Sequence, residues 1–461
     1  MALDAINKMN TICAISTPYG SGGIAVIRVS GTSAIEIVDR LFHGRKSLTE
    51  SKAYTVHYGE IKRSSVVASP ESKNEEVLDQ VLVSIFRAPH SFTGEDVVEI
   101  ACHGSTYIQQ TLLQWLVDAG CQLAKAGEFT QRAFLNGKMD LTEAEAVADL
   151  IAAQTKAEKD LALSQLRGGI SNELAALRQR LVTFTSLIEL ELDFADHEEL
   201  EFADRQQLFN LAQEIDTKIS DLVSSFKTGN AIKQGIPVAI IGAPNVGKST
   251  LLNALLGEER AIVSDIQGTT RDTIEDTLVL GGMLFRFIDT AGMRQTDDTI
   301  ENLGIERSRQ AAQRATIIVH LQDATNPTNI LEQITDIHDK TIIHVYNKVD
   351  LLPSFEAKEG TLSISAKNGE VALLRQQLIA FAEQQCNIRN AVTISNTRHY
   401  EALARAQGAI QRVQEGLRMQ ISGELLSMDL QDCLAALGEI TGQITSQEVL
   451  NNIFSKFCIG K

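Results

Sequence analysis

A glycine-rich loop supplies the first residues in this chain whose types and spacing suggest chemistry. Residues 242–249, GAPNVGKS, fit the pattern GxxxxGK[ST] and lie between the strand-like run PVAII and the helix-like run STLLNALLG. In such a loop, backbone N–H groups and the helix N-terminus face phosphate oxygens, and the helix dipole favours negative charge. Lys248 is predicted to reach the β- and γ-phosphates, and the Ser249 hydroxyl to bind Mg²⁺. The predicted phosphate-binding residues are Asn245, Val246, Gly247, Lys248, Ser249 and Thr250.

Two later segments are candidates for sensing the γ-phosphate. Asp289 and Gly292 begin and end the sequence DTAG, which follows the strand-like run LFRFI. Asp289 can hold Mg²⁺ through water, and the Gly292 N–H can meet the γ-phosphate. Thr269 and Thr270, in GTTRD, are switch candidates, because one hydroxyl can complete the Mg²⁺ shell when the γ-phosphate is present.

Two further motifs predict which base is bound. The sequence NKVD, residues 347–350, follows the strand-like run TIIHVY. Its Asp350 carboxylate can accept hydrogen bonds from both the ring N–H and the exocyclic amine of guanine. Adenine lacks this donor pair, and rejection through unmade polar contacts can reach roughly 10⁴–10⁵. The sequence SAK offers a backbone N–H to the guanine oxygen. The predicted base-site residues are Asn347, Lys348, Asp350, Ser365, Ala366 and Lys367.

The means of hydrolysis is less plain from the residues alone. Many GTPases place Gln directly after the DTAG-type motif to orient the attacking water, but this chain has Met293 there, and no arginine finger is evident. Asn245, with backbone carbonyls from residues 264–269, is a candidate to cage a monovalent cation beside the phosphates. In the alternative, Asn245 only shapes the turn of the loop. Spacing selects none of the carboxylates that follow the switch, Asp297, Asp298, Glu301 and Glu306, and a carboxylate in such a position is more often surface charge than a catalyst.

The elements that would position these motifs fall into three kinds. Residues before about 122 alternate short β-type runs with turns and helical stretches, whereas residues 237–384 alternate strands with helices, as a doubly wound α/β domain does. Helical periodicity fills the segments on either side of the α/β region. The spacing predicts one buried helix face made by Leu163, Leu166, Ile170, Leu174, Leu177, Leu181 and Phe184.

These patterns predict a multidomain α/β and α protein. An α+β domain spans residues 1–122, and a P-loop GTPase domain at 235–384 is inserted into a helical domain built from 123–234 and 385–461. Such an insertion is tolerated where entry and exit points lie close together.

Composition narrows the class of protein further. Hydrophobic residues make up 44% of the 461 residues, and no apolar run approaches the roughly 20 residues that span a bilayer. The N-terminus lacks the features of a signal or transit peptide, so a cytoplasmic protein is expected. The six cysteines form no CxxC pair, which argues against a disulfide framework or a zinc site. The net charge of −17 excludes nucleic-acid binding by bulk attraction.

Several longer blocks resemble the MnmE (TrmE) family of tRNA-modification GTPases. They include GAPNVGKS, DIQGTTRD, DTAGMR followed by IENLGIERS, and the terminal FCIGK. The likeness continues through STPYGSGGIAVIRVSG, SFTGEDVVEIACHG and GEFTQRAFLNGKMDLTEAEAVADLI, so it covers nearly the whole chain.

The resemblance implies a fold and an activity. It implies an N-terminal domain that dimerises and an FAD-dependent partner, MnmG, that acts with this chain on the wobble uridine of certain tRNAs. The product carries an aminomethyl or carboxymethylaminomethyl group at the uracil 5-position. It also implies potassium-dependent GTP hydrolysis, stimulated when two G domains meet across a homodimer.

The resemblance also assigns roles to single residues. Glu301, in IENLGIE, becomes the carboxylate that orients water, and Ser249 and Thr270 become Mg²⁺ ligands. The implied potassium site comprises Asn245, Ser264, Ile266 and Thr269. The implied site for a formyl-tetrahydrofolate comprises Arg28, Glu99, Lys138 and Lys461.

Cys458 is the residue whose role is hardest to assign. It stands fourth from the end, as in a prenylation box, but Gly460 and the terminal Lys461 match that motif poorly. The family resemblance places it near the folate site with a catalytic role in modification, whereas its residue type alone indicates a thiol without chemistry.

Two other functions remain open at this point. A ribosome-assembly GTPase would use the same motifs as a nucleotide-dependent switch on RNA, but such proteins usually add a basic RNA-binding domain, and this acidic chain shows none. A dimerisation scaffold with vestigial hydrolysis is disfavoured by the intact Lys248, Ser249, Asp289 and Asp350. Because of the net charge, we expect tRNA to be held mainly by the partner.

Overall fold

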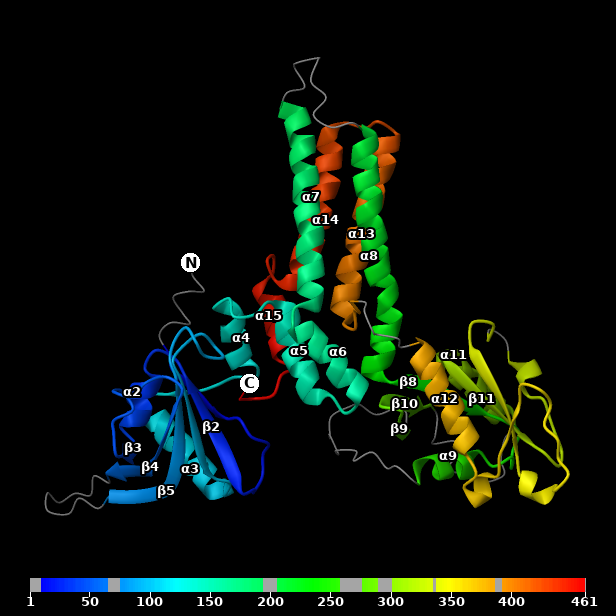
Figure 1. Ribbon diagram of the computed structural model, residues 1–461, viewed down its shortest axis with the longest axis horizontal. Helices are drawn as coiled ribbons and strands as arrows, with labels where there is room; N and C mark the ends of the chain where they lie inside the picture. Colours follow the sequence, from blue (N-terminus) through cyan, green and yellow to red (C-terminus); the bar gives the residue numbers. More distant parts are fainter. Residues whose placement is uncertain are drawn as a thin grey trace. The chain divides into compact units, whose positions relative to one another are not determined.

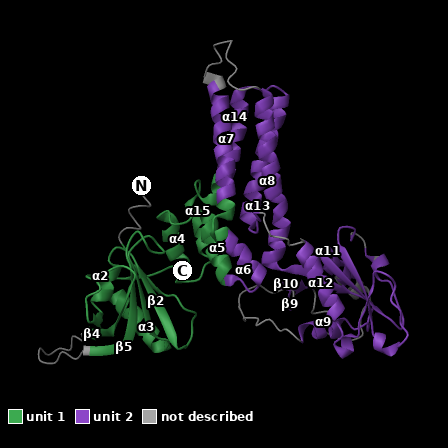
Figure 2. Ribbon diagram, in the orientation of Figure 1, with its two compact units in different colours: residues 1–151, 165–171, 438–461 green, residues 152–164, 172–437 purple. Residues whose placement is uncertain are grey.

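The computed structural model describes residues 10–64, 75–193, 205–257, 276–288, 301–334, 337–385 and 392–460 (Figure 1). The chain divides into two compact units (Figure 2). Unit 1 comprises Met1–Ile151, Gln165–Ser171 and Gly438–Lys461, and unit 2 comprises Ala152–Ser164 and Asn172–Leu437.

A seven-stranded sheet forms the centre of unit 1, with the strand order β3-β4-β5-β6-β2-β1-β7. Its strands are β1 (Ile12–Ile15), β2 (Ile24–Ser30), β3 (Phe42–Gly44), β4 (Thr55–Ser64), β5 (Glu75–Phe86), β6 (Val97–His103) and β7 (Gln122–Leu123). Alternate residues of the central strands enter one core with α2 (Ala34–Asp39) and α3 (Thr106–Asp118). The opposite face of the sheet therefore carries the other half of each strand's side chains.

The C-terminal end of the chain belongs to unit 1 together with the helices that follow the sheet. These helices are α4 (Glu128–Leu135), α5 (Leu141–Ala152) and α15 (Gln447–Phe454). Leu141 of α5 packs with Leu450 and Phe454 of α15 in one apolar cluster. The packing joins sequence segments that are some three hundred residues apart.

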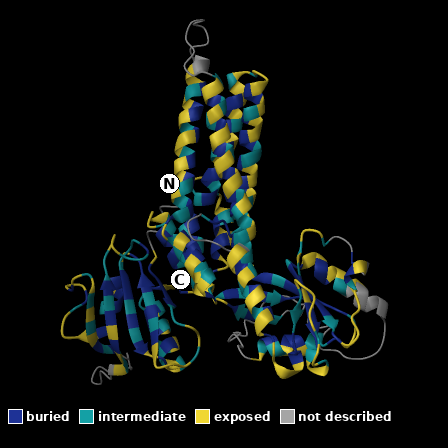
Figure 3. Cartoon of the chain, turned by 45° about the vertical axis from the view of Figure 1, so that its right-hand side comes forward, coloured by how far each residue is buried: buried dark blue, intermediate teal, exposed yellow. Residues whose placement is uncertain are grey.

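Four long helices run alongside one another in unit 2 (Figure 1). They are α7 (Gly169–Asp193), α8 (Arg205–Gln234), α13 (Thr397–Arg418) and α14 (Gly423–Thr441). Buried and exposed positions alternate along them (Figure 3), as expected for helices with one face in a core.

The predicted apolar stripe is confirmed within α7 but does not form a single helix face. Ile170, Leu174, Leu177, Leu181 and Phe184 are all buried. Leu163 and Leu166 are half-buried and belong to a separate helix, α6 (Lys156–Leu166). The break falls at Gly168, whose φ of +79° is in the left-handed region that ends helices.

An α/β domain in unit 2 carries the nucleotide motifs. Its six strands have the order β13-β12-β11-β8-β10-β9, and all are parallel except β9. They are β8 (Ile236–Ile241), β9 (Asp276–Leu280), β10 (Met283–Phe287), β11 (Ile317–Asp323), β12 (Thr341–Asn347) and β13 (Leu362–Ser363).

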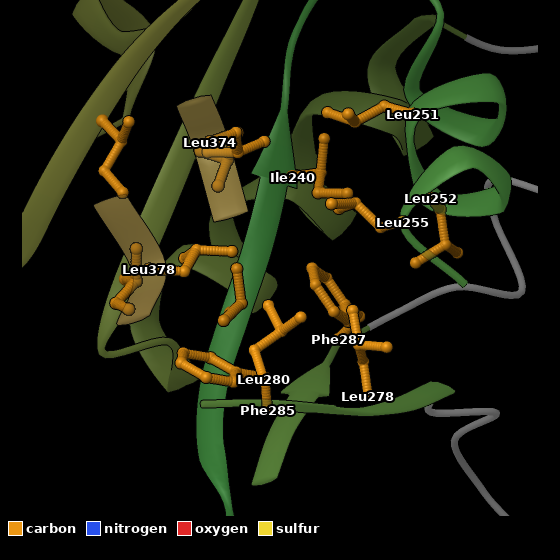
Figure 4. Packing of buried hydrophobic residues seen from close by; sticks show 14 of the residues in the cluster. Ile240, Leu251, Leu252, Leu255, Leu278, Leu280, Phe285, Phe287, Leu374 and Leu378 are labelled. Atoms are coloured by element: carbon orange, nitrogen blue, oxygen red, sulfur yellow. The ribbon is translucent and has the colours of Figure 1, made fainter. Parts of the chain in front are cut away.

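Helices pack on both faces of this sheet. On one face α9 (Lys248–Leu256) and α12 (Ala372–Gln385) contribute Leu251, Leu374 and Leu378 to a core with the strands (Figure 4). On the other face α11 (Glu301–Arg314) contributes Ala311 and Ala312. The predicted fold class, with a P-loop α/β domain inserted between helical segments and preceded by an α+β domain, is confirmed.

Two segments of the chain connect the helices with the α/β domain: the C-terminal half of α8, and the return segment before α13 that includes Ile394. These two segments lie side by side. Phe226 of α8 stacks on Tyr400 of α13 with ring centroids 4.5 Å apart. A Cβ added at Gly229 of α8 would lie 2.1 Å from the Ile394 oxygen, so the return segment can approach α8 only because this residue has no side chain.

We therefore expect Gly229→Ala to lower the free energy of unfolding by about 1–3 kcal/mol, because overpacking forces the return segment away from α8. Gly408→Ala in α13 is the matched control: a Cβ there meets nothing within 4 Å, and the change should stabilise the helix by about 0.5–1 kcal/mol. Thermal unfolding of the full chain, followed by circular dichroism, measures both. Equal melting temperatures for the two variants would contradict the close approach at Gly229.

Candidate nucleotide site

The phosphate loop lies between the end of β8 and the start of α9, and two of its glycines are required by space. A Cβ at Gly242 would lie 2.3 Å from the Leu321 oxygen. A Cβ at Gly247 would lie 2.4 Å from the Asn347 side-chain nitrogen, and Gly247 also has a φ of +98°. These contacts hold the loop against the ends of β11 and β12, so the loop sits at the carboxyl edge of the sheet, where ligands of such folds bind.

Lys248 points its ammonium group back into the loop. Its Nζ donates to the Gly242 oxygen at 2.8 Å and to the Ala243 oxygen at 2.9 Å. Burial lowers the pKa of Lys248 from its ordinary value. The phosphate loop thus encloses a cation, and a phosphate oxygen would accept a stronger, charge-assisted hydrogen bond from it.

Asn347 connects the phosphate loop with the base-site loop. Its Nδ2 donates to the Val246 oxygen at 2.8 Å, and its Oδ1 accepts from the Ala366 N–H at 2.9 Å. The side chain is buried, and it lies at the last residue of β12. One amide group therefore fixes the spacing between the segments predicted to bind phosphate and base.

Asp350 and Ser365 form the adjacent pair of the predicted base site. The Ser365 hydroxyl donates to Asp350 Oδ1 at 2.6 Å. Ser365 is fully buried, whereas Asp350 is exposed. The hydroxyl orients one carboxylate oxygen and leaves the exposed side of Asp350 available for a ligand. Lys367 of the same loop is exposed.

The structure places Asn245, Val246, Lys248, Ser249 and Thr250 together at the start of α9. Asn245 has a φ of +63°, a left-handed conformation that Asn tolerates better than most residues. Glu301 begins α11, but its side chain is outside the described part of the structure. The remaining predicted residues outside the described ranges are Ser264, Ile266, Thr269, Thr270, Asp289, Gly292 and Lys461.

Sequence inspection missed one charged residue of this site. Asp323, the last residue of β11, accepts a hydrogen bond from Lys348 Nζ at 2.6 Å through its Oδ2. Its strand pairs in register with β12, so Asp323 lies opposite Asn347. The sequence did offer one signal for Asp323, because it is an acidic residue at the end of a buried parallel strand. None of the recognised nucleotide motifs includes it.

A second cluster of charged residues lies in unit 1. Arg28 of β2 and Glu99 of β6 are register partners, and Arg28 Nη2 lies 2.8 Å from Glu99 Oε1. The guanidinium also lies over the rings of Phe92 and Phe129, with centroid distances of 5.5 Å and 5.7 Å. A cation that lies over two aromatic rings and pairs with a carboxylate is attracted by all three groups.

The C-terminal tail reaches the same cluster. The Gly460 oxygen accepts from Ser16 Oγ at 3.0 Å and from Arg28 Nη1 at 3.4 Å. The Gly127 N–H donates to the Cys458 oxygen at 3.4 Å, and the thiol of Cys458 is exposed. Lys138 instead donates to the Pro89 oxygen at 3.1 Å, in unit 1.

Comparison with known proteins identifies the relatives of this chain. A family model described as the MnmE helical domain matches residues 141–458, and one described as the N-terminus of the GTP-binding protein TrmE matches residues 11–138. The tRNA modification GTPase MnmE of Parabacteroides distasonis is 54% identical, covering 98% of this chain and 100% of that protein. The chain belongs to the MnmE family of tRNA-modification GTPases. The MnmE protein of Phocaeicola vulgatus is 52% identical over 98% of this chain and 99% of its own length.

Solved structures add little to this assignment. The G domain of the T. maritima FeoB iron transporter covers 32% of this chain and 98% of its own, at 22% identity and a TM-score of 0.24.

Membership of the MnmE family makes the chain a GTP hydrolase of tRNA modification and disfavours a ribosome-assembly switch. In the described part of the chain, no helix has the length and apolarity needed to cross a membrane.

The amide bridge through Asn347 leads to a test. Asn347→Ala leaves the Val246 oxygen and the Ala366 N–H without this partner, so we expect the Kd for GDP to rise by about tenfold or more. Asn368→Ala, at an exposed position of the same base-site loop, is the control and should change the Kd by less than about twofold. Titration with a fluorescent GDP analogue measures both, and equal affinities would rule out the bridge as an organising contact.

Proposed function

We propose that this chain is a potassium-dependent, dimerisation-activated GTPase. It acts with an FAD-dependent MnmG-type partner to install an aminomethyl or carboxymethylaminomethyl group at the 5-position of the tRNA wobble uridine. The one-carbon donor is a formyl-tetrahydrofolate. The observation that carries the proposal is the Asn347 bridge, which sets a phosphate loop beside an aspartate suited to guanine in a chain of this family.

We propose that the nucleotide and folate sites lie in separate domains of the chain. Residues 1–122 form the dimerisation and folate-binding domain, and residues 235–384 form the G domain. Residues 123–234 and 385–461 form the two parts of the helical domain. The observation that supports a G domain with its own sheet is the six-stranded order around β8.

Nucleotide binding is assigned residue by residue. Asp350, exposed and oriented by Ser365, accepts the donor pair of guanine. Lys248 neutralises the phosphates from inside the loop. Ser249, at the start of α9, and Thr270 hold Mg²⁺, which polarises the phosphates when bound. Water, oriented by Glu301, attacks the γ-phosphorus, and the bond from that phosphorus to the bridging oxygen of GDP breaks to give phosphate.

A homodimer is supported by the outer face of the unit 1 sheet. Tyr58 of β4 and Leu82 of β5 are register partners on this face, and their side chains are 63% and 48% exposed. Val56 of β4, Val77 of β5 and Ile24 of β2 are also exposed. An apolar row of this kind on a sheet face favours burial against another surface. We propose a second copy of the chain as its partner, which brings two G domains within reach of each other.

The folate site is proposed at the Arg28–Glu99 cluster. A carboxylate such as Glu99 can pair with the amino-pyrimidinone edge of a pterin, and Arg28, Lys138 and Lys461 suit the carboxylates of the glutamate tail. The Gly460 contacts with Ser16 and Arg28 place the tail that carries Cys458 at this cluster. Cys458 is accordingly proposed as a residue of the modification reaction.

The potassium proposal is tested at Asn245. We expect GTP turnover in KCl to exceed that in NaCl of equal ionic strength by roughly tenfold or more, because the cation neutralises charge that develops on the phosphates. Asn245→Gly permits the same positive φ but removes the amide oxygen, and it should abolish the difference between the two salts. Turnover per chain should also rise with chain concentration if dimerisation activates hydrolysis.

Asn245→Asp is the matched variant, because it tolerates a positive φ and keeps an oxygen at the same position. It should retain potassium stimulation. If Asn245→Gly retained as much potassium stimulation as Asn245→Asp, Asn245 would only shape the loop, and the proposed cation site would be wrong.

The folate proposal is tested at Glu99. Glu99→Ala should weaken binding of 5-formyl-tetrahydrofolate by about tenfold or more in equilibrium dialysis, since the pterin loses its acceptor. Glu60→Ala, on strand β4 of the same sheet and separated from β6 by β5, is the control and should bind as the natural chain does. Both variants should keep GTP turnover, and Cys458→Ser should keep folate binding while losing tRNA modification. If Glu99→Ala bound 5-formyl-tetrahydrofolate as tightly as the natural chain does, the folate site would not lie at this cluster.

A further inference from the structure

The ion pair between Asp323 and Lys348 joins the last residue of β11 to the residue that follows β12. Lys348 Nζ lies 2.6 Å from Asp323 Oδ2, and the side chains are 32% and 16% exposed. The other carboxylate oxygen, Oδ1, accepts from the Thr325 N–H at 2.9 Å and from the Thr325 hydroxyl at 2.6 Å. Asp323 therefore uses one oxygen to hold its own turn and the other to hold Lys348.

The charged form of Asp323 is favoured in this setting. Burial works against ionisation, but the hydrogen bonds from Lys348 and Thr325 outweigh it and keep the pKa of Asp323 below its ordinary value. The Asp323 carboxylate is thus ionised at neutral pH, and the partial burial of the pair reduces the screening that weakens exposed pairs.

Lys348 lies at a strained point between the two base-site residues. Its φ of +65° is in the left-handed region, which a residue with a Cβ adopts at a cost. This conformation turns the chain between Asn347, which is bonded to the phosphate loop, and Asp350, which is bonded to Ser365. If Lys348 relaxed to an ordinary conformation, Asn347 and Asp350 could not both keep these contacts.

We propose that Asp323 is a positioning residue for guanine recognition: by holding Lys348 in its left-handed conformation, it fixes the direction of the Asp350 carboxylate. The proposal rests on the assignment of Asp350 as the acceptor for guanine. Asp323 does not itself meet the base. Its influence runs through Lys348 and the backbone that joins Lys348 to Asp350, over a short distance at the ends of β11 and β12.

Asp323→Asn isolates the ion pair. The amide oxygen of Asn can still accept both hydrogen bonds from Thr325, while its NH₂ group faces the Lys348 ammonium and cannot bond to it. We expect the Kd for GDP to rise about three- to tenfold. The Kd for IDP, whose base lacks the exocyclic amine, should rise less, so the preference for GDP over IDP falls. At saturating GTP, kcat should stay within about twofold, because the substitution changes no residue of the phosphate loop.

Thr325→Val is the matched control. It removes the hydroxyl that donates to Asp323 Oδ1 and leaves the Asp323–Lys348 pair in place. The proposal expects no change in the ratio of the two Kd values. If Thr325→Val lowered the ratio as much as Asp323→Asn does, the turn and not the ion pair would be responsible, and the proposal would be overturned.

A double-mutant cycle with Lys348→Met completes the test, since Met keeps an apolar stem without charge. If Asp323 acts through Lys348, Asp323→Asn has no further effect in the Lys348→Met background. An equal effect in both backgrounds would falsify the proposal. A natural chain that bound GDP and IDP equally would instead refute the assignment of Asp350, so the two failures are distinguishable.

Discussion

The two hydrogen bonds of the Asn347 amide are the contacts on which the arrangement of the nucleotide site depends. A buried amide must satisfy both its donor and its acceptor, and here the partners are the Val246 oxygen and the Ala366 N–H. Because these two groups come from loops on either side of β12, satisfying one side chain fixes the spacing between the segments predicted to bind phosphate and base. Gly247 permits this by leaving room for the Asn347 nitrogen.

This constraint works only because the strands that carry the loops are parallel neighbours. β8 pairs with β11 and β11 with β12, so their carboxyl ends meet at one edge. The buried apolar residues of β8, β10, β11 and β12 make the sheet a rigid platform between helices on both faces. Polar groups on the loops can then keep fixed separations, because the packed strands beneath them resist movement.

Unit 1 follows a different physical principle. Its charged cluster is built across an antiparallel pair, where Arg28 and Glu99 face each other in register. Aromatic rings from two other segments hold the guanidinium, and the C-terminal tail closes on it through the Gly460 oxygen. Gly460 has a φ of +94°, and a Cβ there would lie 2.3 Å from the Ile15 oxygen, so the tail fits only with glycine at this position.

The local sequence determined those features that depend on short spacings. The phosphate loop, the NKVD and SAK loops and the α/β alternation could be predicted, because each is set by neighbouring residues and by strand or helix periodicity. The tertiary structure decided the rest. The break at Gly168 depends on a left-handed conformation that apolar spacing does not report. The pairing of Asp323 with Lys348, and of Arg28 with a carbonyl 432 residues away, exists only because the fold brings distant segments together. Side-chain hydrogen bonds across such separations leave no periodic trace in the sequence, so only the three-dimensional arrangement identifies them.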